Sequence, residues 1–518
     1  MTSNPAGASG NGGTSHRFLI SLAVMSATVL QALDTTIVNV ALPHMQGQLG
    51  ATPDQISWVL TSYLVASGVC MPLTGYFADR LGQKNFLLLS ILGFVVSSAL
   101  CGLSTNLAEI VLFRLTQGVF GAALVPMSQS IMVQTFPAEE RGRAMAIWGI
   151  GVMVGPILGP TLGGYITEVV NWRWTFYINL PVGILSLFLA WRMVPDTPRR
   201  ERSMDWLGMV LMSCAVGGLQ FVLDRGTEAD WFSSWAIRLA AFLSVIGLLG
   251  FLYHGLTRPH KAMFDPRIFH DRNFATASLL LAVFGLGMYG AMVLQPMMLE
   301  TLLNYPTSTT GLIMAPRGVA SMISMMLVGK LITRIQPRAL IAFGIVLSAI
   351  GSHAMTMYSL EIDKWWLIWP VIVQGFGLGM IFVPLSTVAF STLPKEQSAE
   401  AAGVYSLMRT VGSSVGISIA TTVMTRYMQV TWNQLGGHIS LYNPALNSYL
   451  KGLHVTLADP TAIAVLAQSL ANQAQMLGVL DAFKLISWSF IAMLPMVLMI
   501  GRAKQHTTKE EAMAAAIE

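Results

Sequence analysis

The chain has 518 residues, of which 54% are hydrophobic and only 11% are charged. Ordinary soluble domains carry about 25% charged residues, so the composition excludes a soluble protein and predicts one that crosses a membrane several times. The formal net charge of +5 follows from basic loops on one side of that membrane, and no nucleic-acid partner is expected.

Fourteen apolar runs are long enough to cross a bilayer as helices, which predicts an all-α integral membrane protein. In chain order they are residues 18–42, 56–77, 86–104, 108–134, 143–167, 174–192, 206–223, 236–256, 274–300, 309–332, 338–358, 365–391, 401–427 and 483–501. Residues 1–17, rich in Gly, Ser and Asn near the start, are expected to be a disordered cytoplasmic N-terminus, and 505–518 a cytoplasmic tail.

The loops differ in charge between the two sides of the membrane. Twenty of the thirty Lys and Arg fall on one side and seven on the other, while Arg114, Arg317 and Arg409 lie within apolar runs. Because basic loops stay in the cytoplasm, we expect both termini there. No cleavable signal is expected, since the first run is too long and carries Asp34.

Asp34 and Arg114 are ionisable residues inside predicted spans, where burial is costly unless the charge is paired. Counting residues from the outer ends places both at a depth of about 12 Å at 1.5 Å per residue. We therefore expect them to meet in the outer half of the bundle. Their pairing suits either proton coupling, because a moving partner changes the proton affinity of the carboxylate, or a static tie between two helices.

A basic loop after the second span reads GYFADRLGQKN, with Asp79, Arg80 and Lys84 in a tight turn. We predict that these three residues control a cytoplasmic gate by pairing with helix ends and neighbouring loops. Ordinary topology would explain the basic residues but not Asp79.

Parts of the chain repeat at an offset of about 254 residues. GKLITRIQPRA places Gly329, Arg334 and Arg338 where the first copy has Gly75, Arg80 and Lys84, and Gln374 echoes Gln117. The repeat predicts two homologous six-helix halves, 18–200 and 261–504, with two inserted helices in 201–260.

A third motif, GVMVGPILGPTLGG, has glycine at every fourth position from Gly151. On a helix this spacing makes a bare ridge for close helix packing, and proline loosens the helix. We predict a hinge or packing seam that takes part in gating, formed by Gly155, Pro156, Gly159 and Pro160.

Seven motifs occur along the chain, each at the span or loop where one protein family has it. They are LQALDTTIVNVALP (30–43), GYFADRLGQKN (75–85), LFRLTQGVFGAALVP (112–126), the glycine segment, WRWTFYINLPVGI (172–184), LDRGTEADWF (223–232) and GLIMAPRGVA (311–320). Together they resemble the fourteen-span drug:proton antiporters of the major facilitator superfamily, the EmrB/QacA type, most closely its EmrB branch. The glycine segment is similar to the antiporter motif of that superfamily.

The resemblance implies the major facilitator fold and a proton-coupled multidrug efflux antiporter. It would export hydrophobic or amphipathic compounds across the inner membrane, with proton coupling at Asp34 and Arg114. The alternative is a dedicated exporter of one natural amphiphile, such as a fatty acid, siderophore or bile salt. The expected partners are the lipid bilayer, protons, a periplasmic adaptor of the EmrA type and an outer-membrane channel.

A substrate site is expected near the midplane between the halves. Its candidate residues are Gln31, Asn39, Tyr289, Met292, Gln295, Arg317, Met322, Met326, Phe376 and Met380. For Arg317 a packing role is an open alternative, and Arg409 is expected to be structural. We find no motif for a metal, a cofactor, ATP hydrolysis or an enzyme, and no large soluble domain that a receptor would bring.

The segment 428–482 is expected to be a periplasmic loop between the last two spans. Apolar residues from Ile463 to Leu477 recur every three or four positions, which predicts an amphipathic helix. This helix either helps to engage the adaptor or lies on the membrane as a lid over the substrate path.

Overall fold

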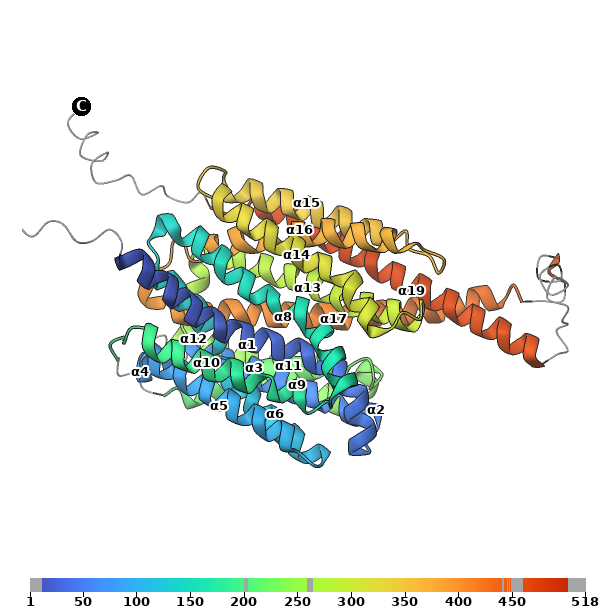
Figure 1. Cartoon of the computed structure of the whole chain (residues 1–518), viewed down its shortest axis with the longest axis horizontal. Coiled ribbons are helices and arrows are strands. Elements are labelled where there is room, and N and C mark those ends of the chain that lie inside the picture. Colours follow the sequence, from blue (N-terminus) through green and yellow to red (C-terminus); the bar gives the residue numbers. More distant parts are fainter. Residues whose placement is uncertain are drawn as a thin grey trace, which may run out of the picture.

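The computed structural model describes residues 12–199, 204–258, 264–439, 442–444, 446, 448 and 460–501. Every regular element in these ranges is a helix, and the long helices run along the long axis of the molecule (Figure 1). The described chain begins and ends at the same end of the bundle, which we call the terminal face, and the opposite end is the distal face.

The first half of the chain supplies six crossings, three of them broken by short interruptions. Its elements are α1 (Gly12–Leu49), α2 (Pro53–Ile56), α3 (Trp58–Cys70), η1 (Met71–Leu73), α4 (Thr74–Leu81), α5 (Gln83–Leu103), α6 (Leu107–Gly121), α7 (Leu124–Thr135), η2 (Ala138–Glu140), α8 (Arg141–Val169), α9 (Trp174–Tyr177) and α10 (Asn179–Met193). One break falls beside Pro72, one just before Pro126, and one at Ile178, three residues before Pro181. Proline has no N–H to donate, so the regular helix is interrupted there.

The second half supplies the other six crossings, and two further helices come between the halves. The second-half elements are η4 (Pro266–His270), α13 (Arg272–Thr301), α14 (Thr307–Leu331), α15 (Pro337–Met355), α16 (Lys364–Ala389), η5 (Lys395–Gln397), α17 (Ser398–Gly436) and α19 (Pro460–Val497). The inserted elements are α11 (Trp206–Arg225), η3 (Trp231–Ser233) and α12 (Trp235–Thr257).

All fourteen predicted spans fall on helices, which confirms the all-α membrane fold. Within the described residues, thirteen helical stretches are long and apolar enough to cross a membrane. The predicted span that is not among these thirteen is 401–427, which lies on α17. The many Ser, Thr and Gly residues of α17 lower its hydropathy, although it packs against α13 and α19. The first helix begins at Gly12, earlier than the expected boundary at residue 18, and residues 1–11 and 502–518 lie outside the described ranges.

The inserted helices lie beside the junction of the two halves. Helix α11 packs against α3 of the first half and α17 of the second, where Gln220 Nε2 donates to Ser414 Oγ at 2.7 Å. The outer helix α12 packs on α11 through Gly247, where an added Cβ would lie 2.6 Å from the Leu211 carbonyl oxygen. Many large apolar side chains of α12 are exposed, as expected for a helix that faces lipid.

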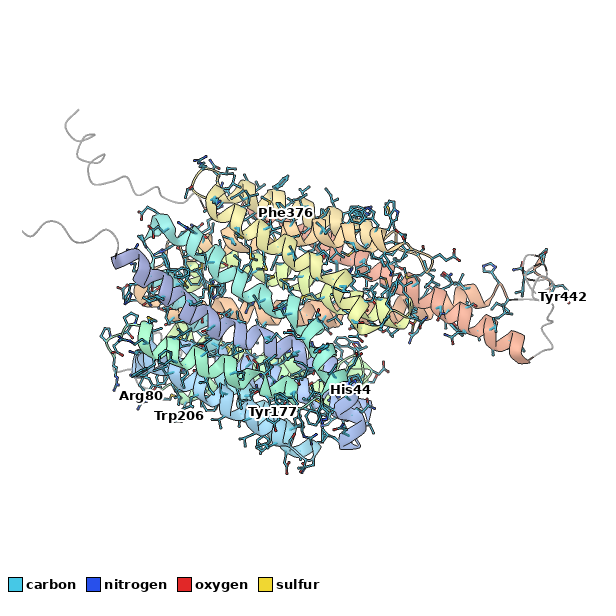
Figure 2. The ribbon with its side chains drawn as sticks, in the orientation of Figure 1. His44, Arg80, Tyr177, Trp206, Phe376 and Tyr442 are labelled. Carbon is cyan, nitrogen blue, oxygen red and sulfur yellow. The ribbon has the colours of Figure 1, made fainter. Side chains whose placement is uncertain are left out.

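The segment 428–482 differs from the predicted loop. Helix α17 continues to Gly436, and α19 begins at Pro460 and runs without a break into the last span. At 1.5 Å per residue, α19 extends about 35 Å before residue 483. Both helices project beyond the distal face (Figure 1), and Figure 2 shows Tyr442 near the tip. A helix covers residues 463–477 as predicted, but it is continuous with the last span and projects from the bundle. The adaptor contact and the lid over the substrate path both stay predictions.

Candidate functional site

A buried ion pair ties α1 to α6 in the first half. Arg114 Nη1 lies 2.8 Å from Asp34 Oδ2, and the two side chains are 1% and 0% exposed. The structure therefore brings together the two charges whose depths the sequence matched. Taking a charge from water into a low-dielectric interior is costly, so the pair depends on good geometry and further hydrogen bonds.

Two amides complete the surroundings of the carboxylate. Gln117 Nε2 donates to Asp34 Oδ1 at 3.0 Å, and Asn179 Nδ2 donates to the same oxygen at 2.7 Å. The guanidinium of Arg114 also donates to the Val59 carbonyl at 3.1 Å. We call Asp34, Arg114, Gln117 and Asn179 the carboxylate cluster. Three donors hold the carboxylate and water has no access to it in this conformation.

The remaining face of Arg114 is covered by an aromatic ring. Its guanidinium carbon lies 4.3 Å from the centroid of the Tyr63 ring, a cation–π contact. Our sequence analysis did not identify Tyr63, Gln117 or Asn179 as members of this site. Gln117 follows Arg114 by three residues and so shares its helix face, a signal that was available, whereas Asn179 is brought in only by the packing of α10.

The glycine ridge of α8 packs against α1 beside this cluster. A Cβ added at Gly155 would overlap the Ala32 carbonyl, and one at Gly159 would overlap the Thr36 hydroxyl. Thr36 Oγ1 also donates to the Gly155 carbonyl at 2.9 Å. Ala32 and Thr36 are each two residues from Asp34, so the ridge contacts the opposite side of α1 from the carboxylate.

The ridge therefore packs inside the first half, and the face of α8 that meets the second half is a different one. Pro156 lies on that other face, and Ile157 packs so closely on α14 that a Cβ at Gly318 would overlap it. The gating hinge expected at Gly155, Pro156, Gly159 and Pro160 remains a prediction. The structure shows that the helix packed against the two glycines is α1.

A small cavity lies where α8 meets the second half. It is lined by Met153, Pro156, Ile157, Met288, Met292, Met314, Arg317, Gly318, Ser321 and Leu378. Its volume of about 30 Å³ accommodates about two water molecules. A hydrophobic substrate would therefore require the helices or the methionine side chains to move apart.

The structure separates the predicted substrate residues into those at the cavity and those elsewhere. Met292 and Arg317 line it, and Gln295 accepts a hydrogen bond from Arg317 Nη2. Tyr289, Met322 and Phe376 are half-buried and do not line this cavity.

Four predicted substrate residues lie clearly away from the cavity in this conformation. Met326 is 58% exposed on the outside of α14, while Met325, one residue earlier and 100° around the helix, points inward. Asn39 is exposed, Gln31 Oε1 accepts from the Val125 backbone N–H at 3.2 Å, and Met380 packs on Gly344. A single sequence does not give the rotation of each helix, which explains these differences.

The basic loop lies at the terminal face, where Figure 2 labels Arg80. Arg80 Nη1 donates to the Tyr76 hydroxyl at 2.6 Å, Lys84 Nζ lies 3.9 Å from the exposed Asp196 carboxylate, and Asp79 is half-buried. Gly75 lets α4 cross α17 closely, because an added Cβ would lie 2.8 Å from Glu400 Cα.

Further bonds between the halves lie near the same face. Gln134 Nε2 donates to Ser398 Oγ at 2.6 Å, and Arg141 Nη1 donates to the Phe390 carbonyl at 3.0 Å. Ser130 and Ser398 also share a hydrogen bond of 3.0 Å. These contacts hold the two halves together at the terminal face.

Two helical halves, a buried charge cluster and a cavity at their junction define a membrane transport protein. A sequence profile of the Major Facilitator Superfamily matches residues 24–417. The chain belongs to this superfamily, as an EmrB-type transporter. The resemblance found in the sequence and the expected fold are thereby confirmed.

Similar proteins give the same family. The chain is 34% identical over 487 residues to the multidrug export protein EmrB of Haemophilus influenzae, covering 92% of this chain and 94% of that protein. It is 32% identical over 481 residues to the fatty acid resistance protein FarB of Neisseria gonorrhoeae, covering 92% and 95%. A solved structure of the proton:xylose symporter XylE matches with a TM-score of 0.64 at 13% identity, covering 97% of this chain and 99% of that one, which supports the fold.

Proposed function

We propose that this transporter is a proton-coupled antiporter that exports hydrophobic or amphipathic compounds across the inner membrane. The observation that carries the proposal is the carboxylate cluster, an ionisable group sealed inside a transport protein at 0% exposure. Intramembrane carboxylates are costly, and proton relays are among their established uses. The multidrug export activity named for the EmrB relative supports the substrate class.

The cluster is suited to alternate between two protonation states. In this conformation Arg114, Gln117 and Asn179 all donate to Asp34, so both of its carboxylate oxygens are occupied. If α1 shifts against α6 or α10, the carboxylate loses these donors and its oxygens become free to accept a proton. Proton binding and release would then accompany the movement of the halves.

A dedicated exporter of one natural amphiphile is the second candidate. The observation that favours it is the 32% identity to a relative named for fatty acid resistance. The two candidates share the mechanism above and differ in the range of compounds that bind.

The arrangement in the cell is also part of the proposal. We propose that both termini and the terminal face lie in the cytoplasm, since the basic loops gather there. Asp79, Arg80 and Lys84 would then form part of the cytoplasmic gate. The projection of α17 and α19 would reach into the periplasm and help to engage an adaptor of the EmrA type, and through it an outer-membrane channel.

Proteoliposomes that contain the purified protein and a trapped pH indicator test the proposal. An imposed proton gradient should drive movement of hydrophobic compounds, and a gradient of such a compound should move protons the other way. A proton ionophore should abolish both fluxes, and transport that is indifferent to the pH gradient would contradict antiport. A susceptibility panel in a strain without its own pumps separates multidrug export, which protects against several unrelated classes, from dedicated export.

A further inference from the structure

Arg317 is a buried cation with few partners. Its side chain is 7% exposed, it lines the cavity, and it donates from Nη2 to Gln295 Oε1. Its Nε and Nη1 atoms have no hydrogen-bond partner, and the Nε2 atom of Gln295 has none either. No carboxylate among the described residues forms an ion pair with it.

The repeat shows why this charge is uncompensated. Arg317 follows Tyr63 by 254 residues, the offset that relates Gly75 to Gly329. Tyr63 and Arg317 also pack on corresponding glycines. A Cβ added at Gly118 would lie 2.5 Å from the Tyr63 carbonyl oxygen, and one added at Gly375 would overlap the Arg317 carbonyl oxygen.

The matching acid is missing from the second half. Gly155 packs on Ala32 of α1, and its counterpart Gly412 packs on Ala282 of α13, so the position that corresponds to Asp34 is Phe284, a buried apolar residue. Each half thus buries an arginine, but among the described residues only the first half supplies a carboxylate that pairs with it. An unpaired charge at this depth is costly, and an anion would relieve the cost.

The rest of the cavity suits an apolar tail. Met153, Met288, Met292 and Met314 line it, and flexible thioether side chains repack around ligands of different shape. The guanidinium offers free N–H donors at one place in an otherwise mostly apolar wall, which is the arrangement of a head-group site.

We propose that Arg317 binds the carboxylate of an anionic amphiphile whose hydrocarbon part displaces the cavity methionines. This inference rests on the proposed export function and narrows its substrate class from hydrophobic compounds in general to those with a carboxylate head group. Gln295 Nε2 is a second donor close to the same head group.

Three twelve-carbon probes that differ only in head group test the proposal: dodecanoate, dodecyltrimethylammonium and dodecanol. Binding to the purified full-length protein is measured by calorimetry at pH 8, where a fatty-acid carboxyl is ionised. We expect the wild type to prefer dodecanoate, and Arg317→Gln to weaken dodecanoate binding by about tenfold or more, as for loss of a charge-assisted hydrogen bond. Binding of the other two probes should change little.

A second variant keeps Arg317, so the test does not depend on whether Arg317→Gln folds. Gln295→Glu places a carboxylate of nearly the same volume beside Arg317, so it should neutralise the guanidinium and weaken dodecanoate binding while the melting temperature is kept or raised. Arg409→Gln is the matched control, an intramembrane arginine outside the cavity lining, and it should retain the preference for dodecanoate.

The inference is overturned if the wild type binds the cationic probe as tightly as dodecanoate, or if dodecanoate binds Arg317→Gln and Gln295→Glu as it binds the wild type. Complete competition by chloride would also overturn it, because the site would then hold a free inorganic anion. Failure of the proposed function looks different: dodecanoate would still bind through Arg317, but no compound would move against protons in proteoliposomes.

Discussion

Replacing Asp34 by Asn should abolish proton coupling, and the structure shows why the amide is a poor substitute. Asp34 accepts from Arg114 at one oxygen and from Gln117 and Asn179 at the other. An Asn side chain has one oxygen and one NH₂ group. If its oxygen faces Arg114, its NH₂ meets two donors, and if it is flipped, the NH₂ meets a cation.

The cost follows from the burial of the pair. Removing one member of a buried ion pair costs about 3–5 kcal/mol, because the other charge is left uncompensated. Asp34→Asn should therefore destabilise the protein as well as uncouple it. The double variant Asp34→Asn with Arg114→Gln removes both charges, so it should be more stable than Asp34→Asn alone.

Melting of the purified variants and proton flux in proteoliposomes separate these two effects. We expect the double variant to recover stability while proton-driven export stays absent. Asp224→Asn is the matched control, since Asp224 is a half-buried acid on α11 that accepts from the Thr61 hydroxyl and is not bonded to Arg114, Gln117 or Asn179. Normal pH-driven export by the double variant would refute the role of Asp34.

Three further predictions test other parts of the structure. Gly155→Ala should lower the free energy of unfolding by about 1–3 kcal/mol through overpacking and slow export. Gly151→Ala is the control, because a Cβ at Gly151 has no neighbour closer than 3.6 Å. Equal melting temperatures and export rates of the two variants would show that the ridge tolerates a side chain. Gly82 has φ +83°, so Gly82→Ala should cost about 1–2 kcal/mol in thermal melting, and an unchanged melting temperature would contradict this strain. Deleting residues 437–458 should abolish adaptor pull-down and whole-cell resistance but spare efflux in proteoliposomes, and retained resistance would make the tip dispensable.

Much of the fold was predictable because a bilayer demands long apolar helices. All fourteen runs appear as helices, and six of them lie on each side of the two inserted helices, in agreement with the offset between Gly75 and Gly329. The meeting of Asp34 with Arg114 followed from depth alone, since helices rise a fixed distance per residue.

The sequence-based predictions were wrong or incomplete where the position of a residue depends on the rotation of its helix or on tertiary packing. A shift of one residue separates the inward Met325 from the exposed Met326, and one sequence does not orient a helix whose faces are all apolar. The partner of the Gly155 ridge and the arrival of Asn179 at the cluster depend on tertiary packing. The helical projection was taken for a loop because its polar residues ended the apolar runs.

Helix α8 connects the two sites that the sequence treated separately. Its Gly155 carbonyl accepts from Thr36 on α1, two residues from Asp34, while Pro156 and Ile157 face the cavity on its other side. Pro156 has no N–H to donate, so the helix is loosened at this point. A ligand that widens the cavity would bend or rotate α8 at Pro156, where a backbone hydrogen bond of the helix is missing. Close packing at Gly155 would then transmit that movement to α1. We therefore expect occupancy of the cavity and protonation of Asp34 to be coupled through this helix.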